Sequence, residues 1–183
     1  MSNGKITAMI GAHLTDCLPH DYDVFYDHGR TAESRNVKAC LGLLSQEPSN
    51  ATRVADFDIV ICRNRAREPA VEAIVEVEEH GFSPKTILGD IMSLMLAKFV
   101  AIKTDNGGHN VYKIGKNTVK YVFGVVKVKG SKSEQIKHFI LPRLRQLIAA
   151  RLLDQIPHVI VLNEYDDLGA EVIKALKASV GDF

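Results

Sequence analysis

Two stretches in the first half of the chain alternate apolar and polar residues with the two-residue period of a β-strand. The first is VADFDIVI at 54–61, and the second, after a polar turn, is AIVEVEE at 73–79. Because successive strand side chains point to opposite faces, Asp56 and Asp58 share one face of the first strand, and Glu76 and Glu78 share one face of the second. Apolar residues fill the opposite faces, which predicts two half-buried strands of a core sheet that pair as an antiparallel hairpin.

Helical periodicity and turn residues predict the other elements. Val37, Leu41 and Leu44 recur at helical spacing after possible caps at Thr31 or Ser34. Residues 1–30 are expected to hold a short strand or helix with loops. The remaining expectations are a helix from 31 or 34 to about 45, strands at 53–62 and 71–78, a helix at 84–102 capped by Ser83 with Pro84 at its first position, a turn at 105–108, a strand at 118–128, a helical region at 131–154 interrupted at Pro142, a strand at 159–162 and a helix at 169–179.

The composition is that of an ordinary globular protein. The chain has 183 residues, of which 46% are apolar and 25% charged, and this predicts a single α/β domain over 1–183. Asp90 and Lys98 interrupt the longest apolar stretch, so we expect no membrane span and a cytoplasmic protein. Cys17, Cys40 and Cys62 lack CxxC spacing, which argues against a disulfide framework or a structural zinc site.

The charge is unevenly distributed along the chain. Residues 98–151 hold twelve Lys or Arg against only Asp105 and Glu134, whereas residues 1–97 are acidic overall. A basic segment of this kind favours a polyanionic partner such as nucleic acid. The chain has neither a GxxxxGK[ST] nor a GxGxxG loop, which argues against a nucleotide-binding enzyme.

Carboxylates gathered on paired strands repel one another unless a proton or a cation intervenes. If the two strands pair, Asp56, Asp58, Glu76 and Glu78 can converge. Magnesium takes oxygen ligands and usually needs only one or two carboxylates from the protein. A divalent metal site is therefore the simplest interpretation of the acids.

The order of these acids resembles the PD-(D/E)xK nuclease superfamily, whose members have a restriction-endonuclease-like mixed β-sheet flanked by helices. In that family an Asp on one core strand and the first acid of a (D/E)xK tripeptide on the next bind the catalytic metal. The resemblance assigns these places to Asp58 and Glu76. Glu78 stands where the family lysine is expected, a substitution that some restriction enzymes of the superfamily also have. The resemblance implies a hydrolase that uses Mg²⁺, with Mn²⁺ as a possible substitute, to cut DNA.

The resemblance also implies roles for neighbouring residues. Glu78 would act as a general base or as a third metal ligand, and Lys85 would orient the water or hold the phosphate. Asp56 is a reserve ligand, and Glu33 on the first predicted helix is an auxiliary one. Side chains expected to contact the phosphates or a groove edge are Lys113, Lys116, Lys120, Lys127, Lys129, Arg63 and Arg65.

Other interpretations of the same residues stay open. The strand acids would also fit solvent-facing groups paired with arginines in an unrelated α/β protein. A non-catalytic nucleic-acid-binding or assembly module with a degenerate nuclease fold would account for the missing lysine. Asp90 is interpreted as a surface group. If the protein cuts duplex DNA, two active sites are needed, which favours a homodimer.

Overall fold

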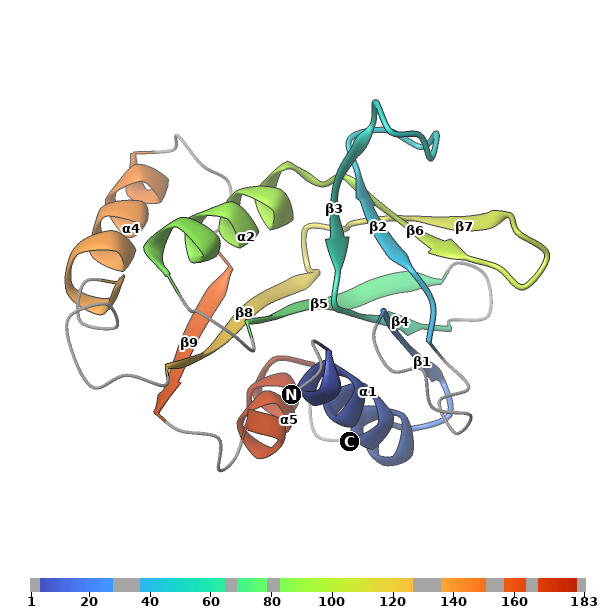
Figure 1. The fold of residues 1–183 in the computed structure, drawn as a ribbon, viewed down its shortest axis with the longest axis horizontal. Helices are drawn as coiled ribbons and strands as arrows, with labels where there is room; N and C mark the ends of the chain where they lie inside the picture. The colour runs from blue at the N-terminus through green and yellow to red at the C-terminus, as the bar shows by residue number, and fades with distance from the viewer. Residues whose placement is uncertain are drawn as a thin grey trace.

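The computed structural model describes residues 4–27, 37–64, 69–78, 83–126, 136–150, 157–163 and 168–180. It is a mixed α/β structure with two sheets and helices around them (Figure 1). The elements are α1 (Lys5–Cys17), β1 (Tyr22–Tyr26), β2 (Cys40–Leu43), β3 (Arg53–Phe57), β4 (Ile59–Arg63), β5 (Ala70–Glu78), α2 (Pro84–Leu96), β6 (Phe99–Lys103), β7 (His109–Lys113), β8 (Val119–Val126), the π-helical turn η1 (Ile136–Ile140), α4 (Leu141–Ala149), β9 (His158–Asn163) and α5 (Leu168–Val180).

The larger sheet has the strand order β1-β4-β5-β8-β9, so its strands follow one another as they do in the chain. β4 runs antiparallel to β1 and β5, whereas β5, β8 and β9 are parallel. The parallel step from β5 to β8 needs a crossover, and α2 lies in this connection. β5 is consequently the central strand and is buried on both faces.

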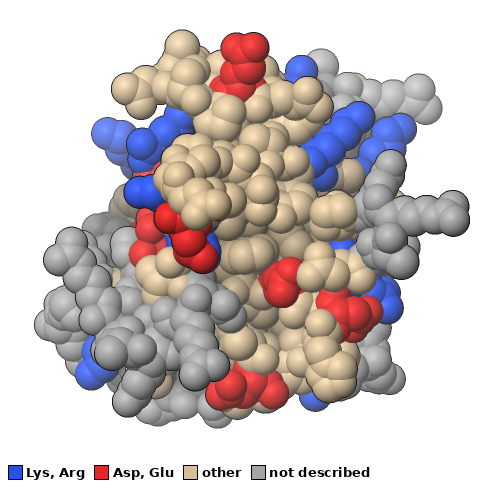
Figure 2. Space-filling view, turned by 90° about the vertical axis from the view of Figure 1, so that its right-hand side faces the viewer, with Lys and Arg blue, Asp and Glu red and all other residues tan. Residues whose placement is uncertain are grey.

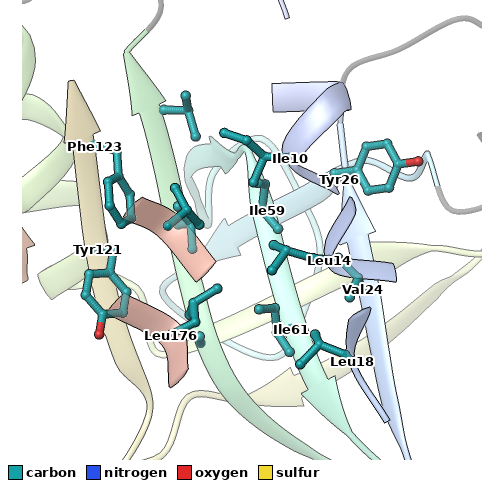
Figure 3. Close-up of a cluster of buried hydrophobic side chains, with 14 residues drawn as sticks. Ile10, Leu14, Leu18, Val24, Tyr26, Ile59, Ile61, Tyr121, Phe123 and Leu176 are labelled. Atoms are coloured by element: carbon teal, nitrogen blue, oxygen red, sulfur yellow. The ribbon is translucent and has the colours of Figure 1, made fainter. Parts of the chain in front are cut away.

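One face of the larger sheet packs against α1 and α5. Ile10 and Leu14 of α1 meet Ile59 and Ile61 of β4 in this layer, and Leu176 of α5 closes it over β8 (Figure 3). The Tyr121 hydroxyl donates a hydrogen bond of 2.9 Å to the Ala175 carbonyl, so its buried polar end is satisfied.

The other face of the larger sheet is covered by α2 and by the second sheet, whose order is β3-β2-β6-β7. Ile87, Ile91 and Leu94 of α2 form the buried stripe of this layer. Leu144 of α4 joins the same layer, so α2 and α4 share one core. This face is where the acids of β5 lie.

Several predictions from the sequence are confirmed. β4 and β5 form an antiparallel hairpin, and β8, β9 and α5 occupy the expected segments. The Ser83 side chain accepts a hydrogen bond from the Thr86 N–H, and Pro84 follows at the start of α2. Residues 105–108 form the turn between β6 and β7, where Gly107 adopts a φ of 78° that favours glycine. The first residues of the helical region predicted at 131–154 lie outside the described residues.

The helix predicted through residue 45 is wrong in its described part, because residues 40–43 form β2 between β3 and β6. Gly42 permits the close approach of the Phe57 ring in this sheet, since a Cβ there would lie 2.5 Å from that ring. The helix predicted to Ile102 is also wrong beyond Leu96, because residues 99–103 form β6. In both segments, pairing with distant strands outweighs a local helical spacing. In residues 1–30 the structure contains both a helix, α1, and a strand, β1.

The single strand predicted at 53–62 is two strands. The strand is interrupted at Asp58, so that β3 belongs to the second sheet and β4 to the first. Asp56 and Asp58 therefore lie on either side of the point where the chain passes from one sheet to the other. None of the described helices is long and apolar enough to cross a membrane.

Candidate functional site

Asp58 and Glu76 form the centre of the candidate site. Ile59 of β4 pairs with Val75 of β5, and this register brings Asp58 beside Glu76 and Val77. The Val77 N–H donates to Asp58 Oδ2 at 2.7 Å, and the Asp58 N–H donates to Glu76 Oε2 at 3.2 Å. Each acid is thus fixed by the backbone of the strand that carries the other, and the two carboxyl groups also hydrogen-bond to each other.

Glu76 is a buried acid in the central strand. Only 7% of the residue is exposed. Burial, followed by the charges of Asp58 and Asp90, raises the pKa of Glu76 well above its ordinary value. A buried carboxyl group of this kind tends to take up a proton or to be held by a cation, because the ionised form is poorly solvated.

A second pair of acids lies next to the first. Glu78, at the end of β5, shares a side-chain hydrogen bond with Asp90 of α2. Burial, with Asp58 as a further cause, raises the pKa of Glu78 although the hydrogen bond from Asp90 opposes this. Burial, followed by the charge of Glu78, raises the pKa of Asp90 to about 7. Asp90 Oδ2 is buried, and among the described residues no group hydrogen-bonds to it.

The four carboxyl groups therefore form one electrostatic unit, called here the acidic cluster: Asp58, Glu76, Glu78 and Asp90. The pKa values of Glu76, Glu78 and Asp90 are raised by burial and by the charges of the other acids of the cluster. No Lys or Arg of the described segments is among the causes. Protons or a bound cation would have to compensate the charge.

The acidic cluster has the donor atoms of a metal centre but not its arrangement. Within the part of the chain that the structure describes, no three side chains are placed to hold a metal ion together. The donor chemistry nevertheless fits a hard cation, because the cluster offers only carboxylate oxygens and the buried Asp90 Oδ2 accepts no hydrogen bond from a described group.

Two other predicted site residues lie apart from the cluster. Asp56, on β3, is exposed and forms an ion pair with Arg53, so its expected reserve role has no geometric support. Lys85 is exposed in the first turn of α2, and none of the ion pairs between described residues includes it. Glu33 lies outside the described residues.

The predicted phosphate-binding residues that the structure describes differ in their surroundings. Lys113 on β7 and Lys116 are exposed, whereas Lys120 on β8 is half-buried and burial lowers its pKa. Arg63 donates to Asp21 Oδ2 at 2.8 Å, and its guanidinium lies 5.1 Å from the centre of the Tyr22 ring. The remaining members of the set, Lys127, Lys129 and Arg65, lie outside the described residues. Figure 2 shows that the end of the molecule near the β6–β7 hairpin carries charges of both signs.

Asp90 is the site residue that the sequence interpretation missed, because it was taken for a surface group. A signal was present: Asp90 follows Ile87 by three residues and precedes Leu94 by four, so it falls within the buried stripe of α2. A charged residue inside an apolar stripe indicates a partner on the opposing element, which here is Glu78.

Comparison of the chain with models of known families finds no match, and searches of curated proteins and of solved structures find none either.

Proposed function

We propose that this protein is a metal-dependent nuclease that hydrolyses DNA phosphodiester bonds. The observation that carries the proposal is the pair Asp58 and Glu76 at the centre of the sheet. The Asp58 N–H donates to the Glu76 carboxyl group, and the Val77 N–H donates to the Asp58 carboxyl group, so the two acids lie side by side. Acids in this position reduce stability unless they are neutralised, and a divalent cation would neutralise them while supplying catalytic chemistry.

The fold supports the resemblance to the restriction-endonuclease-like fold at a coarse level. The larger sheet is mixed and has helices on both faces, and the hairpin β4–β5 carries Asp58 and Glu76 before a helix and a parallel strand follow. The resemblance implies this order of the acids, although β6 and β7 of the second sheet lie between α2 and β8. We therefore propose a restriction-endonuclease-like core to which the smaller sheet is added.

In this proposal Asp58 and Glu76 are the protein ligands of Mg²⁺ or Mn²⁺, and Glu78 is the third carboxylate. The metal, when bound, would lower the pKa of a water molecule and stabilise charge on the phosphate. Glu78 would accept a proton at its carboxylate, and the hydrogen bond from Asp90 would orient it. Cutting both strands of a duplex would need two such sites, so a homodimer belongs to the proposal.

A second candidate is a nucleic-acid-binding or assembly module that has lost catalysis. Glu78 in place of the family lysine favours this candidate, as does the absence of three metal-holding side chains among the described residues. In that case the acidic cluster would stay neutral by retaining protons, and Mg²⁺ would not bind.

The test is incubation of supercoiled plasmid with the purified protein at low salt, with Mg²⁺, with Mn²⁺ and with EDTA. Glu76→Gln removes the central carboxylate, and Asp56→Asn is the matched control because Asp56 is a nearby acid outside the cluster. Nicking that needs metal and Glu76, and that survives in Asp56→Asn, would support the nuclease. A plasmid that stays intact but shifts on a gel would replace it with the binding module.

A further inference from the structure

The outward face of η1 and α4 combines an exposed aromatic ring with arginines. Phe139 is 72% exposed, the highest value among the large apolar side chains of the described residues. On the opposite side of the same helical segment, Leu144 is buried, and Ile140 and Leu141 are partly buried against the core that α2 also lines. The segment is therefore anchored by one side, and Phe139 is not part of that anchor.

The exposed side of this segment is cationic. Arg143 follows Phe139 by four residues, so the two lie on one side of the helical segment. Arg145 is exposed as well, but it comes two residues after Arg143 and so lies on the other flank of the helix. Arg143 Nη1 donates to Gln146 Oε1 at 3.0 Å, which extends the polar side of the helix by one turn. Residues 136–150 contain three Lys or Arg and no Asp or Glu, so no acid within the segment opposes this charge.

An exposed ring next to guanidinium groups is a combination that suits unpaired bases. Aromatic side chains stack on the faces of bases, and arginines contact phosphates in bidentate geometry. Bases in an intact duplex are already stacked on one another, so an exposed Phe gains little from duplex DNA. The chemistry of this face consequently selects single strands.

We propose that the exposed side of η1 and α4 binds single-stranded DNA, with Phe139 stacking on an unpaired base and Arg143 and Arg145, on the two flanks of the helix, contacting phosphates on either side of that base. The proposal rests on the proposed nuclease function and extends its substrate to DNA with unpaired bases, such as ends or melted segments. Leu144 lies in the same buried layer as Ile87 and Ile91 of α2, and these two residues flank Asp90. α4 and the helix that carries Asp90 thus share one buried layer.

The experiment measures binding in EDTA, where no metal-dependent cleavage takes place. Fluorescence anisotropy of a labelled 20-nucleotide thymidine strand and of a 20-base-pair duplex is followed at low salt. Phe139→Leu keeps an apolar side chain and removes the ring, and it should weaken single-strand binding about tenfold while leaving duplex binding unchanged. Arg143→Gln with Arg145→Gln should weaken both and reduce the salt dependence of single-strand binding by about one to two phosphate contacts.

Lys5→Gln is the control, because Lys5 is an exposed cation on α1, on the other face of the sheet. Urea denaturation verifies that each variant is folded. Single-strand affinity of Phe139→Leu within twofold of the wild type, or an equal loss for strand and duplex, would overturn the proposal. So would Phe139-dependent binding to phosphatidylserine vesicles without binding to the oligonucleotide, because the face would then be a membrane contact.

The Glu76→Gln variant separates this proposal from the proposed function. It should bind the single strand as tightly as the wild type, since Glu76 is remote in sequence from the face and buried. Metal-dependent plasmid cleavage together with single-strand binding that does not depend on Phe139 would refute the surface and leave the nuclease standing. Phe139-dependent binding without any cleavage would refute the nuclease and leave the surface standing.

Discussion

Replacing Asp90 by Asn should make the metal-free protein more stable than the wild type, and this difference should grow as the pH rises from 5 to 8. Asn has nearly the same size and can still donate a hydrogen bond to Glu78, but it carries no charge. Burial and the charge of Glu78 raise the pKa of Asp90 from 3.8 to about 7. The folded protein therefore keeps a proton on Asp90 that the unfolded chain has already lost, and the stability that this provides disappears as the pH rises through the folded pKa.

The magnitude follows from the shift. Each pKa unit corresponds to about 1.4 kcal/mol, so the whole interval from 3.8 to about 7 represents about 4 kcal/mol. Asp90 is only partly buried, and we halve this figure because solvent screens its charge. Raising the pH from 5 to 8 covers about two thirds of this interval. The difference in free energy of unfolding between variant and wild type should therefore grow by about 1.5 kcal/mol from pH 5 to pH 8.

The assay is urea denaturation in EDTA at pH 5, 6, 7 and 8, from which the free energy of unfolding is obtained at each pH. The free energy of the wild type should fall relative to that of Asp90→Asn as the pH rises. Asp56→Asn is the control, because Asp56 is exposed and paired with Arg53, so its effect should be below about 1 kcal/mol. A difference between Asp90→Asn and wild type that is the same at pH 5 and pH 8 would refute the assignment of Asp90 to the cluster.

Three further predictions test the structure around the site. Gly11→Ala should destabilise the protein by about 1–3 kcal/mol in urea, because the new Cβ would lie 2.4 Å from the Tyr26 ring. Gly89→Ala, which meets nothing within 4 Å, should instead stabilise by about 1 kcal/mol, and effects of the same sign would contradict this packing. Ser83→Ala removes the cap of α2 and should cost about 1 kcal/mol by the same assay, so an unchanged midpoint would exclude that cap. Saturating Mg²⁺ should raise the melting temperature of the wild type but not of Glu76→Gln, and an equal rise in both would place the ion elsewhere.

The candidate site was predictable in part because its residues lie on regular strands. The alternation around Glu76 and Glu78 identified a strand with two acids on one face, and the structure has both on β5. The grouping of Asp56 with Asp58 failed, because the chain changes sheets at Asp58 and the alternation does not continue through that point. Such a break depends on which distant strands are available for pairing, and no local pattern encodes that.

The second sheet was the least predictable part of the fold. β2 and β6 each pair with strands distant in the chain, and both segments have apolar residues at helical spacing. Residues 99–102 continue the apolar stripe of α2 in sequence. The Lys98 N–H nevertheless donates a hydrogen bond to the Leu43 carbonyl, and the residues that follow form a strand. Here a few long-range backbone hydrogen bonds decide between two states that the local sequence supports about equally.

Glu76 is the position at which stability and function oppose each other. It lies in the central strand of the larger sheet, between β4 and β8, where an apolar side chain would add to the core. A buried carboxylate instead loses hydration, and Asp58 beside it adds repulsion. A violation of core patterning at one place, with Asp58, Glu78 and Asp90 gathered around it, is typical of a functional site. If the cluster binds a cation, the same acids that weaken the metal-free protein must stabilise it in Mg²⁺. The response to Mg²⁺ must therefore be largest at the pH where the metal-free protein is weakest, because there the carboxylates have lost the protons with which the cation competes.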